Sequence, residues 1–310
     1  MSFTPRAAWA DTPAPLQAAV ADALGTRIAG HQDLTGGMSP GPAAALRLAD
    51  GRTVFAKAMS AEVRAHNHML IGRESAVLDV LPPSVPAPRR LATVEHGPWI
   101  ALVTTWAAGT VQELWTDASI DAVVGACKTV SGHGAPDELR PVAERIWDFD
   151  GWERVVTAGP ADEWEAANAA RAAEVVADWP RWTAGDALVH RDMRADNVAV
   201  DLATGSATLL DWAYAAAGVP WLDLAQLAAD IVGTGHRLGG QVATDRSYRL
   251  LQALPADAAR FVVAMSGMWR IRAATVQHSV LPTISAWRRE RVQASRPLVT
   301  RLIIDLTEGR

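Results

Sequence analysis

The sequence predicts an α+β fold in two parts, a β-rich first lobe followed by a larger, mainly helical second lobe. Strand-like segments dominate before residue 107, and apolar residues at helical spacing dominate after residue 119. Runs of strands that precede runs of helices are typical of this fold class, with a cleft where the two parts meet. At 310 residues the chain also exceeds the size at which one hydrophobic core is comfortable.

Composition argues against several classes of function. The net charge is −5 and no arginine-rich run alternates with aromatic residues, which argues against a nucleic-acid binder. No run approaches the roughly 18 apolar residues of a membrane span, and the first residues lack a signal-peptide pattern. Cys127, the one cysteine, has apolar helical neighbours that predict a buried structural thiol. We expect a cytoplasmic protein that binds neither nucleic acid nor membrane.

The first lobe is predicted to contain a short helix, three strands, a long helix and two further strands. Thr12-Pro13 opens the short helix and Gly25 closes it. Pro82 ends the long helix. The predicted ranges are 13–24 and 61–81 for the helices, and 26–34, 43–49, 52–59, 90–95 and 99–106 for the strands.

A connection rich in glycine, proline and serine joins the first two strands over residues 35–42. Gly36 and Gly37 would let backbone N–H groups approach phosphate oxygens. An ordinary hairpin loop has the same composition, and no G-x-G-x-x-G pattern is present. Taken alone, this loop favours the ordinary interpretation.

Lys57 is unexpected where it stands. Only two of the 29 basic residues are lysines, and this one lies inside an apolar strand. It is either an edge-strand lysine that reaches solvent or a flexible ammonium that reaches nucleotide phosphates. Glu74 lies beside the apolar stripe of the long helix, so it is either an exposed helical acid or a partner that pairs with Lys57.

Helices dominate the second lobe. The only strand signals there are two short runs, 198–200 and 207–210, joined by a turn. The predicted helical ranges are 120–130, 164–179, 221–232, 245–254, 256–276 and 283–306.

The most informative motif of the chain, residues 190–197, has the form H-x-D-x-x-x-x-N and lies between two apolar runs. Asp211 follows at the end of the next strand signal. Phosphoryl transfer from ATP needs a carboxylate to orient the acceptor hydroxyl and oxygen ligands that hold Mg²⁺ on the phosphates. Asp192, Asn197 and Asp211 offer these groups from one loop and the strand end beside it.

The order of these parts resembles the protein-kinase-like fold, and most closely its aminoglycoside phosphotransferase and choline kinase-like branch. Residues 189–197 resemble the H-G-D-x-x-x-x-N loop of that branch, and Asp211 stands at its metal aspartate. Residues 218–225 resemble its G-x-P-x-x-D-L-A run. The resemblance extends from about residue 34 to residue 229 and is most specific around the motif.

This resemblance implies a bilobal small-molecule kinase that uses ATP, with GTP as the alternative donor, and Mg²⁺. Asp192 would be the catalytic base, and Asn197 and Asp211 would hold the metal. Lys57, braced by Glu74, would contact the phosphates. The lobe boundaries that it implies are 1–103 for the nucleotide-binding lobe, 104–109 for the hinge and 110–310 for the helical lobe with the acceptor pocket.

The remaining implied roles concern nucleotide contacts and loop support. His190 would support the motif loop through hydrogen bonds, and Asp223 would brace it from a helix start, unless Asp223 is a simple N-terminal helix charge. Asp196 is expected to have no catalytic part. The implied nucleotide-binding positions are Gly36 and Gly37 in the glycine-rich loop and Thr105, Trp106 and Ala107 in the hinge.

Two departures from the family pattern leave other functions open. Arg191 replaces the usual glycine, which gives the His-Arg-Asp of protein kinases, and Trp212-Ala213 replaces Phe-Gly. No Ala-Pro-Glu follows Asp211, however, and the long stretch 109–189 is typical of the small-molecule branch. A catalytically inactive regulator of the same fold is the second alternative, although no catalytic position is lost.

The acceptor is expected to be a small hydroxylated molecule, cationic ones included, such as an aminoglycoside-like antibiotic, a sugar or an amino alcohol. A cluster of tryptophans and acids either packs as ordinary helices or lines the acceptor pocket. Both a monomer and a homodimer fit the sequence. The cluster contains Trp147, Trp152, Trp164, Trp179 and Trp182, with Asp148, Asp150, Glu153, Asp162, Glu163 and Glu165.

Overall fold

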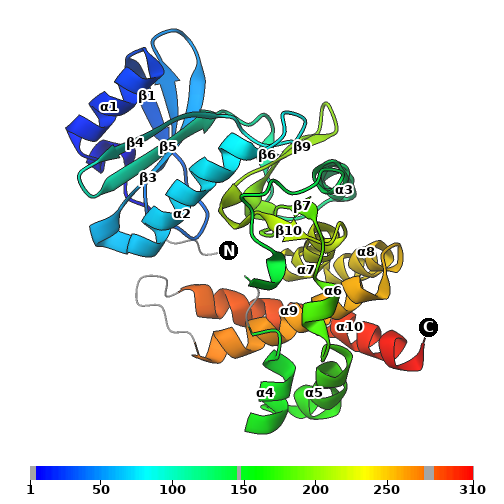
Figure 1. Ribbon diagram of the computed structural model, residues 1–310. Coiled ribbons are helices and arrows are strands. Elements are labelled where there is room, and N and C mark those ends of the chain that lie inside the picture. Colours follow the sequence, from blue (N-terminus) through cyan, green and yellow to red (C-terminus); the bar gives the residue numbers. More distant parts are fainter. Residues whose placement is uncertain (1–4, 145–147, 276–282, 310) are drawn as a thin grey trace.

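The computed structural model describes residues 5–144, 148–275 and 283–309 and has the predicted α+β architecture (Figure 1). The first lobe is an antiparallel sheet with strand order β1-β2-β3-β5-β4. Helices and strands form close to the predicted ranges. They are α1 (Ala14–Leu24), α2 (Ala61–Val80), β1 (Ile28–Asp33), β2 (Ala43–Leu48), β3 (Thr53–Ser60), β4 (Arg90–His96) and β5 (Trp99–Thr105).

Side-chain alternation along β3 decides where Lys57 points. Val54, Ala56 and Ala58 are buried on one face of the sheet, in a core cluster that includes Trp9 and residues of α1. Lys57 therefore projects from the opposite face, against which α2 packs. In Figure 1 the strands lie between α1 and α2.

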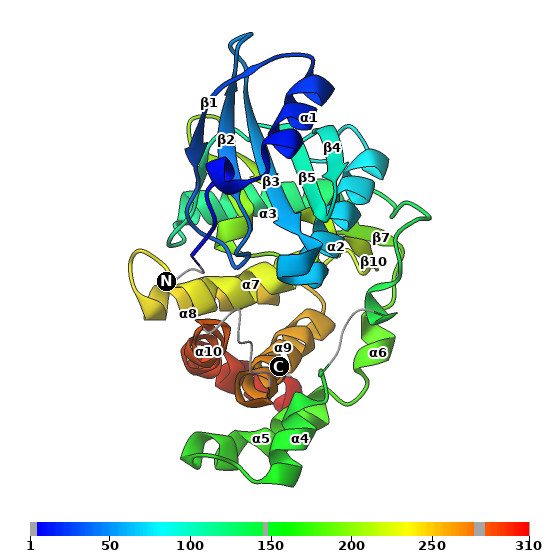
Figure 2. The same ribbon diagram turned by 90° about the vertical axis from the view of Figure 1, so that its left-hand side faces the viewer.

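The second lobe is built around α7 (Leu222–Thr234), which is buried along most of its length. Figure 2 shows α7 directly below the first lobe, with α9 and α10 beneath it. The other helices are α3 (Asp117–Ser131), α4 (Gly151–Ala158), α5 (Glu163–Val175), α6 (Trp179–Trp182), α8 (Gly240–Gln252), α9 (Ala256–Thr275) and α10 (Thr283–Glu308).

Short strands frame the motif. The predicted pair forms as β8 (Val198–Asp201) and β9 (Ser206–Leu209), with β6 (Thr110–Val111) beside β8. An additional antiparallel pair joins β7 (Ala187–Val189) to β10 (Ala216–Gly218). The expectation of only two strands in this lobe is therefore wrong. Segments of three residues, one of them Ala-Ala-Gly, carry too little alternation to be recognised.

The predicted helix over 164–179 is also wrong at its end. α5 stops at Val175, and α6 begins separately at Trp179. Pro180 follows immediately, and a proline is tolerated in the first turn of a helix but not in its interior. A new helix must therefore start here.

Three of the clustered tryptophans, Trp152, Trp164 and Trp182, pack against other aromatic residues of the second lobe. Trp152 is 1% exposed, and its Nε1–H donates to the Val263 carbonyl at 2.8 Å. The Trp164 ring lies beside it in a tilted arrangement with the ring centroids 5.8 Å apart, and the Trp182 ring lies edge-on to Phe261 at 6.5 Å. The ordinary packing interpretation holds for these three, and Trp147 lies outside the described residues.

Arginines pair with four of the six acids of the same cluster, Asp148, Asp150, Asp162 and Glu165. Glu165 pairs with Arg270 at 2.5 Å, and Asp148 pairs with Arg272 at 2.8 Å. Because their charge is already compensated, these carboxylates offer little to a cationic acceptor.

Two further expectations concern the environment of Cys127 and membrane-spanning segments. Cys127 is buried as predicted, and burial raises the pKa of its thiol. Within the parts of the chain that the structure describes, no helix combines the length and hydrophobicity of a membrane span.

Candidate active site

The motif loop, residues 190–197, connects β7 to β8 where the two lobes meet. Asn197 Nδ2 donates to Asp192 Oδ2 at 2.8 Å and to the Asp192 carbonyl at 2.9 Å. The Asp192 side chain remains 20% exposed. Burial raises the pKa of Asp192, and the nearby Arg194 guanidinium opposes that rise. The loop thus presents one firmly oriented carboxylate that solvent still reaches.

Asp223 lies in the first turn of α7 and binds the start of the motif loop. Its Oδ2 accepts from the His190 backbone N–H at 2.7 Å, and its Oδ1 accepts from the Arg191 N–H at 2.8 Å. Both carboxylate oxygens are therefore used on backbone donors. This geometry fits a brace better than a free helix-terminal charge.

Gln226 and Asp230 extend this support along the same face of α7, and sequence reasoning missed both. Gln226 accepts from the Met193 N–H at 3.3 Å, and Asp230 accepts from the Ala195 N–H at 2.9 Å. Together with Asp223 they stand at helical spacing on one face. Polar residues at that spacing in an otherwise apolar helix were the signal in the sequence.

His190 is buried and links the motif loop to the end of β9. Because a carbonyl only accepts, Nε2 donates to the Leu210 carbonyl at 2.8 Å, and Nδ1 accepts from the Asp192 N–H at 3.3 Å. Burial lowers the pKa of His190, and its ring lies edge-on to Trp212 at 4.7 Å. A neutral imidazole with both nitrogens occupied supports the loop and has no lone pair left for chemistry.

Lys57, Glu74 and Asp211 meet across the lobe junction. The Lys57 ammonium contacts Glu74 and donates to Asp211 Oδ1 at 3.1 Å. Burial disfavours the charge on Lys57, but the two carboxylates outweigh it and raise its pKa. Burial also disfavours the charge on Asp211, yet Lys57 and Arg194 hold the pKa of Asp211 at about 2. The pair of Lys57 with Glu74 forms as expected, and the strand lysine does not point to solvent.

The ionised form of Glu74 is disfavoured in this arrangement. Its side chain is 6% exposed, and burial, with Asp211 competing for the same ammonium, raises the pKa of Glu74 to about 7. A folded-state pKa above the unfolded value of about 4.5 gives stability that is fully present below that value and lost as the pH rises towards 7.

We therefore expect the free energy of unfolding of the wild type, relative to Glu74→Gln, to fall by up to about 3 kcal/mol between pH 4.5 and 7. Urea unfolding across this range measures it. Glu62→Gln, which alters an exposed acid on the same helix, should show no such trend. If the wild type instead becomes more stable relative to Glu74→Gln as the pH rises, then Lys57 keeps Glu74 ionised across the whole range.

Arg194 is a second charge centre that sequence reasoning did not identify. Its guanidinium binds Asp196 at 2.9 Å and lies 3.5 Å from Asp192 Oδ1. Asp196 therefore holds Arg194, which agrees with its expected lack of a catalytic part. The resulting positive charge beside Asp192 favours the ionised, proton-accepting form of that carboxylate.

The backbone conformation at Arg191 shows why the resembled family usually has glycine at this position. Arg191 has a φ of 67° and Asp211 a φ of 63°, both in the left-handed region. This region favours glycine, so the glycine expected at 191 is the relaxed choice, and arginine costs about 1–2 kcal/mol there. Such strain at two positions that flank Asp192 and the β9 end is typical of functional sites.

Asn197 and Asp211 fit a divalent metal that binds together with a nucleotide. The Asp211 side chain is 42% exposed, and Lys57 occupies only its Oδ1. Asn197 Oδ1 accepts from Arg194 at 3.3 Å and keeps a second lone pair. The described residues contain no cluster of three or more His, Cys, Asp or Glu ligands. Mg²⁺ commonly takes only one or two protein carboxylates and completes its shell with phosphates and water.

The remaining predicted nucleotide-binding positions lie in the glycine-rich loop and in the segment that follows β5. Gly36 and Gly37 both have positive φ, at 106° and 75°. β5 ends at Thr105, and Trp106 is 45% exposed. Among the described residues, the backbone groups of Trp106 and Ala107 have no hydrogen-bond partner, so they are free to meet a base edge.

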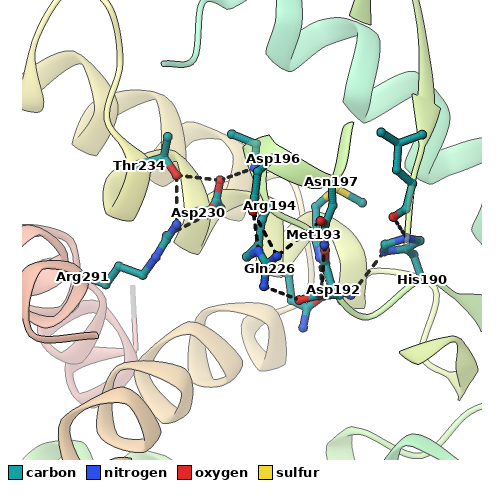
Figure 3. A network of polar contacts seen from close by, with 12 residues as sticks. His190, Asp192, Met193, Arg194, Asp196, Asn197, Gln226, Asp230, Thr234 and Arg291 are labelled. Atoms are coloured by element: carbon teal, nitrogen blue, oxygen red, sulfur yellow. Dashed lines mark hydrogen bonds and ion pairs between the residues drawn. The ribbon is translucent and has the colours of Figure 1, made fainter. Parts of the chain in front are cut away.

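A buried ion pair ties the motif loop to the C-terminal helix, as Figure 3 shows. Arg291 of α10 lies 2.7 Å from Asp230 Oδ1, and both side chains are at most 3% exposed. We expect Arg291→Ala to lower the free energy of unfolding by about 3–5 kcal/mol, because it leaves a buried carboxylate unpaired. Chemical denaturation measures this, with Arg289→Ala, an exposed arginine of the same helix, as control. A loss below about 1 kcal/mol would contradict the assignment.

The sequence profile described as the phosphotransferase enzyme family matches residues 43–260. A thermostable mutant of the aminoglycoside phosphotransferase APH(4)-Ia, in complex with ADP and hygromycin B, has a similar fold, with a TM-score of 0.59, 13% identity and coverage of 93% of this chain and 98% of that one.

Two further solved structures share the fold. The GDP complex of a mutant aminoglycoside 2′-phosphotransferase-IIIa has a TM-score of 0.57, 13% identity and coverage of 91% and 94%. A choline/ethanolamine kinase family protein from Mesorhizobium loti has a TM-score of 0.53, 17% identity and the same coverage. No curated relative matches the chain by sequence.

Proposed function

Because the chain belongs to the phosphotransferase enzyme family, we propose that it moves the γ-phosphate of ATP to a hydroxyl group of a small molecule. The observation that carries this proposal is the meeting of Asp192 and Asn197 with Asp211 and the Lys57 ammonium at the lobe junction. We assign residues 1–103 to the nucleotide-binding lobe, 104–109 to the hinge and 110–310 to the acceptor-binding lobe.

Asp192 is the proposed base. It orients the acceptor hydroxyl and takes its proton as the hydroxyl oxygen bonds to the γ-phosphorus, while the bond to the β,γ-bridging oxygen breaks and ADP leaves. Lys57, aimed by Glu74, binds the α- and β-phosphates. Mg²⁺ held by Asn197 and Asp211 would neutralise charge on the phosphates.

The nucleotide is proposed to lie between the glycine-rich loop and the hinge. Gly36 and Gly37 cover the phosphates, and the free backbone groups of Trp106 and Ala107 bind the adenine edge. ATP is the proposed donor, and GTP is the competitor to run beside it.

The acceptor assay separates this proposal from an inactive regulator. Incubation with Mg-ATP and a panel of aminoglycosides, sugars and amino alcohols should release ADP above the background without acceptor. Hygromycin B belongs in the panel because the similar aminoglycoside phosphotransferase structure contains it. An antibiotic acceptor would make this a resistance enzyme. ATP binding without turnover on any acceptor would favour the regulator, and turnover on a protein substrate would favour a protein kinase.

A further inference from the structure

The segment that precedes α1 places Arg6 beside the glycine-rich loop. Trp9 is 1% exposed in the core of the first lobe, and its backbone N–H donates to Asp33 Oδ1 at 2.8 Å. Ala7 donates its N–H to the Pro40 carbonyl at 3.0 Å. These contacts fix the backbone immediately after Arg6, so the position of its side chain is built into the lobe.

The Arg6 guanidinium binds backbone carbonyls of this loop. Nε donates to the Gly36 carbonyl at 2.6 Å, and Nη1 donates to the Gly41 carbonyl at 3.1 Å. A Cβ on Gly37 would come within 2.5 Å of Nη2. The positive φ of 75° favours glycine at 37, and the guanidinium lies close against this residue.

The hydrogen-bond partners of the Arg6 guanidinium are the loop carbonyls of Gly36 and Gly41, and the charges of two active-site acids also act on it. Burial lowers the pKa of Arg6, and the carboxylates of Asp211 and Asp196 oppose this effect. Within the described part of the chain, no carboxylate lies at ion-pair distance from its guanidinium. Arginine stays protonated even when it is buried, so the full positive charge of Arg6 is hydrogen-bonded to the neutral carbonyls of Gly36 and Gly41.

Two other cations of the site, Lys57 and Arg194, are already paired with carboxylates. Lys57 contacts Glu74 and Asp211, and Arg194 is bound to Asp196 and lies beside Asp192. A triphosphate brings several negative charges beneath the loop that covers it. The planar fork of a guanidinium matches phosphate oxygens, and Arg6 keeps N–H donors that the loop carbonyls do not use.

We infer that Arg6 is a nucleotide-binding residue that contacts the polyphosphate of the donor from the N-terminal segment. This inference rests on the proposed function and adds a contact outside the family-matched segment 43–260. A blocking role for Arg6 would have the opposite effect on nucleotide binding. If Arg6 filled the phosphate position and blocked it, its removal would tighten nucleotide binding.

The test is equilibrium binding by calorimetry to wild type, Arg6→Ala and Arg6→Lys. ATP and adenosine are the two probes, because adenosine lacks phosphates. Arg52→Ala is the matched control, since Arg52 is an exposed arginine of the same lobe that pairs with Asp50 at 2.7 Å. Thermal unfolding of each variant checks that the lobe remains folded.

Arg6→Ala should raise the Kd of ATP by about 10- to 100-fold and leave that of adenosine within about twofold. Arg6→Lys should fall between wild type and Arg6→Ala, and Arg52→Ala should match wild type. An unchanged or lower ATP Kd in folded Arg6→Ala overturns the inference while the proposed function stands. Failure of the wild type to bind ATP overturns both.

Discussion

Replacing Asp192 by asparagine or alanine is expected to lower kcat by about 10²–10⁴-fold while the Kd of ATP changes little. In the proposed mechanism Asp192 accepts the acceptor proton only as phosphoryl transfer proceeds, so its loss would remove transition-state stabilisation rather than nucleotide binding. Asparagine keeps the shape of the side chain and an oxygen that accepts from Asn197. The expected loss in that variant therefore reports the missing base and not a collapsed loop.

Steady-state kinetics with the acceptor found in the panel, together with calorimetric ATP binding, separates the two parameters. Asp201→Asn is the control, because Asp201 ends the adjacent strand β8 and only caps its turn. Near-normal turnover by Asp192→Asn would remove this residue from the mechanism. A large rise in the ATP Kd would mean that the substitution disturbs the phosphate site instead.

Asp211→Ala is expected to abolish the part of ATP binding that depends on Mg²⁺. In the wild type, adding Mg²⁺ should tighten ATP binding, whereas in the variant the ratio of the Kd values with and without metal should fall to about one. The metal-free Kd should be equal to or lower than that of the wild type, because the substitution removes a negative charge and frees the Lys57 ammonium.

Calorimetric titrations of ATP in EDTA and in excess Mg²⁺ measure both effects, with Asp201→Asn again as control. The sign of the metal-free change is informative. Weaker binding of ATP in EDTA would show that Asp211 acts mainly by orienting Lys57, and a retained Mg²⁺ effect would assign the metal to other ligands.

Local sequence patterns predict most of the structure of the first lobe. Alternation in β3 puts Lys57 on the face opposite Val54 and Ala56, and the apolar stripe of α2 brings Glu74 towards that face. Period and turn signals are local properties, so the strands and the order of the two lobes follow from the sequence. The residues alone leave the pairing of Lys57 with Glu74 open beside an exposed helical acid, and only the resemblance to the kinase family implies it.

Contacts between distant segments could not be predicted in this way. Arg6 meets the glycine-rich loop through a fold of the chain that no periodicity encodes, and β7 finds β10 through tertiary packing. Arg291 reaches Asp230 from a helix of the C-terminal third. The tryptophans show why two interpretations stay open at the level of sequence, because a composition typical of binding pockets is also typical of a core.

Phosphate transfer to an acceptor tests the central claim most directly. The assay incubates the wild type with ATP, Mg²⁺ and the acceptor, and measures ADP and the phosphorylated acceptor by mass spectrometry. We expect equal amounts of the two products, formed only with metal and largely lost in Asp192→Asn. ADP formed at the same rate with and without every acceptor, or product formation that survives in Asp192→Asn, would contradict the account.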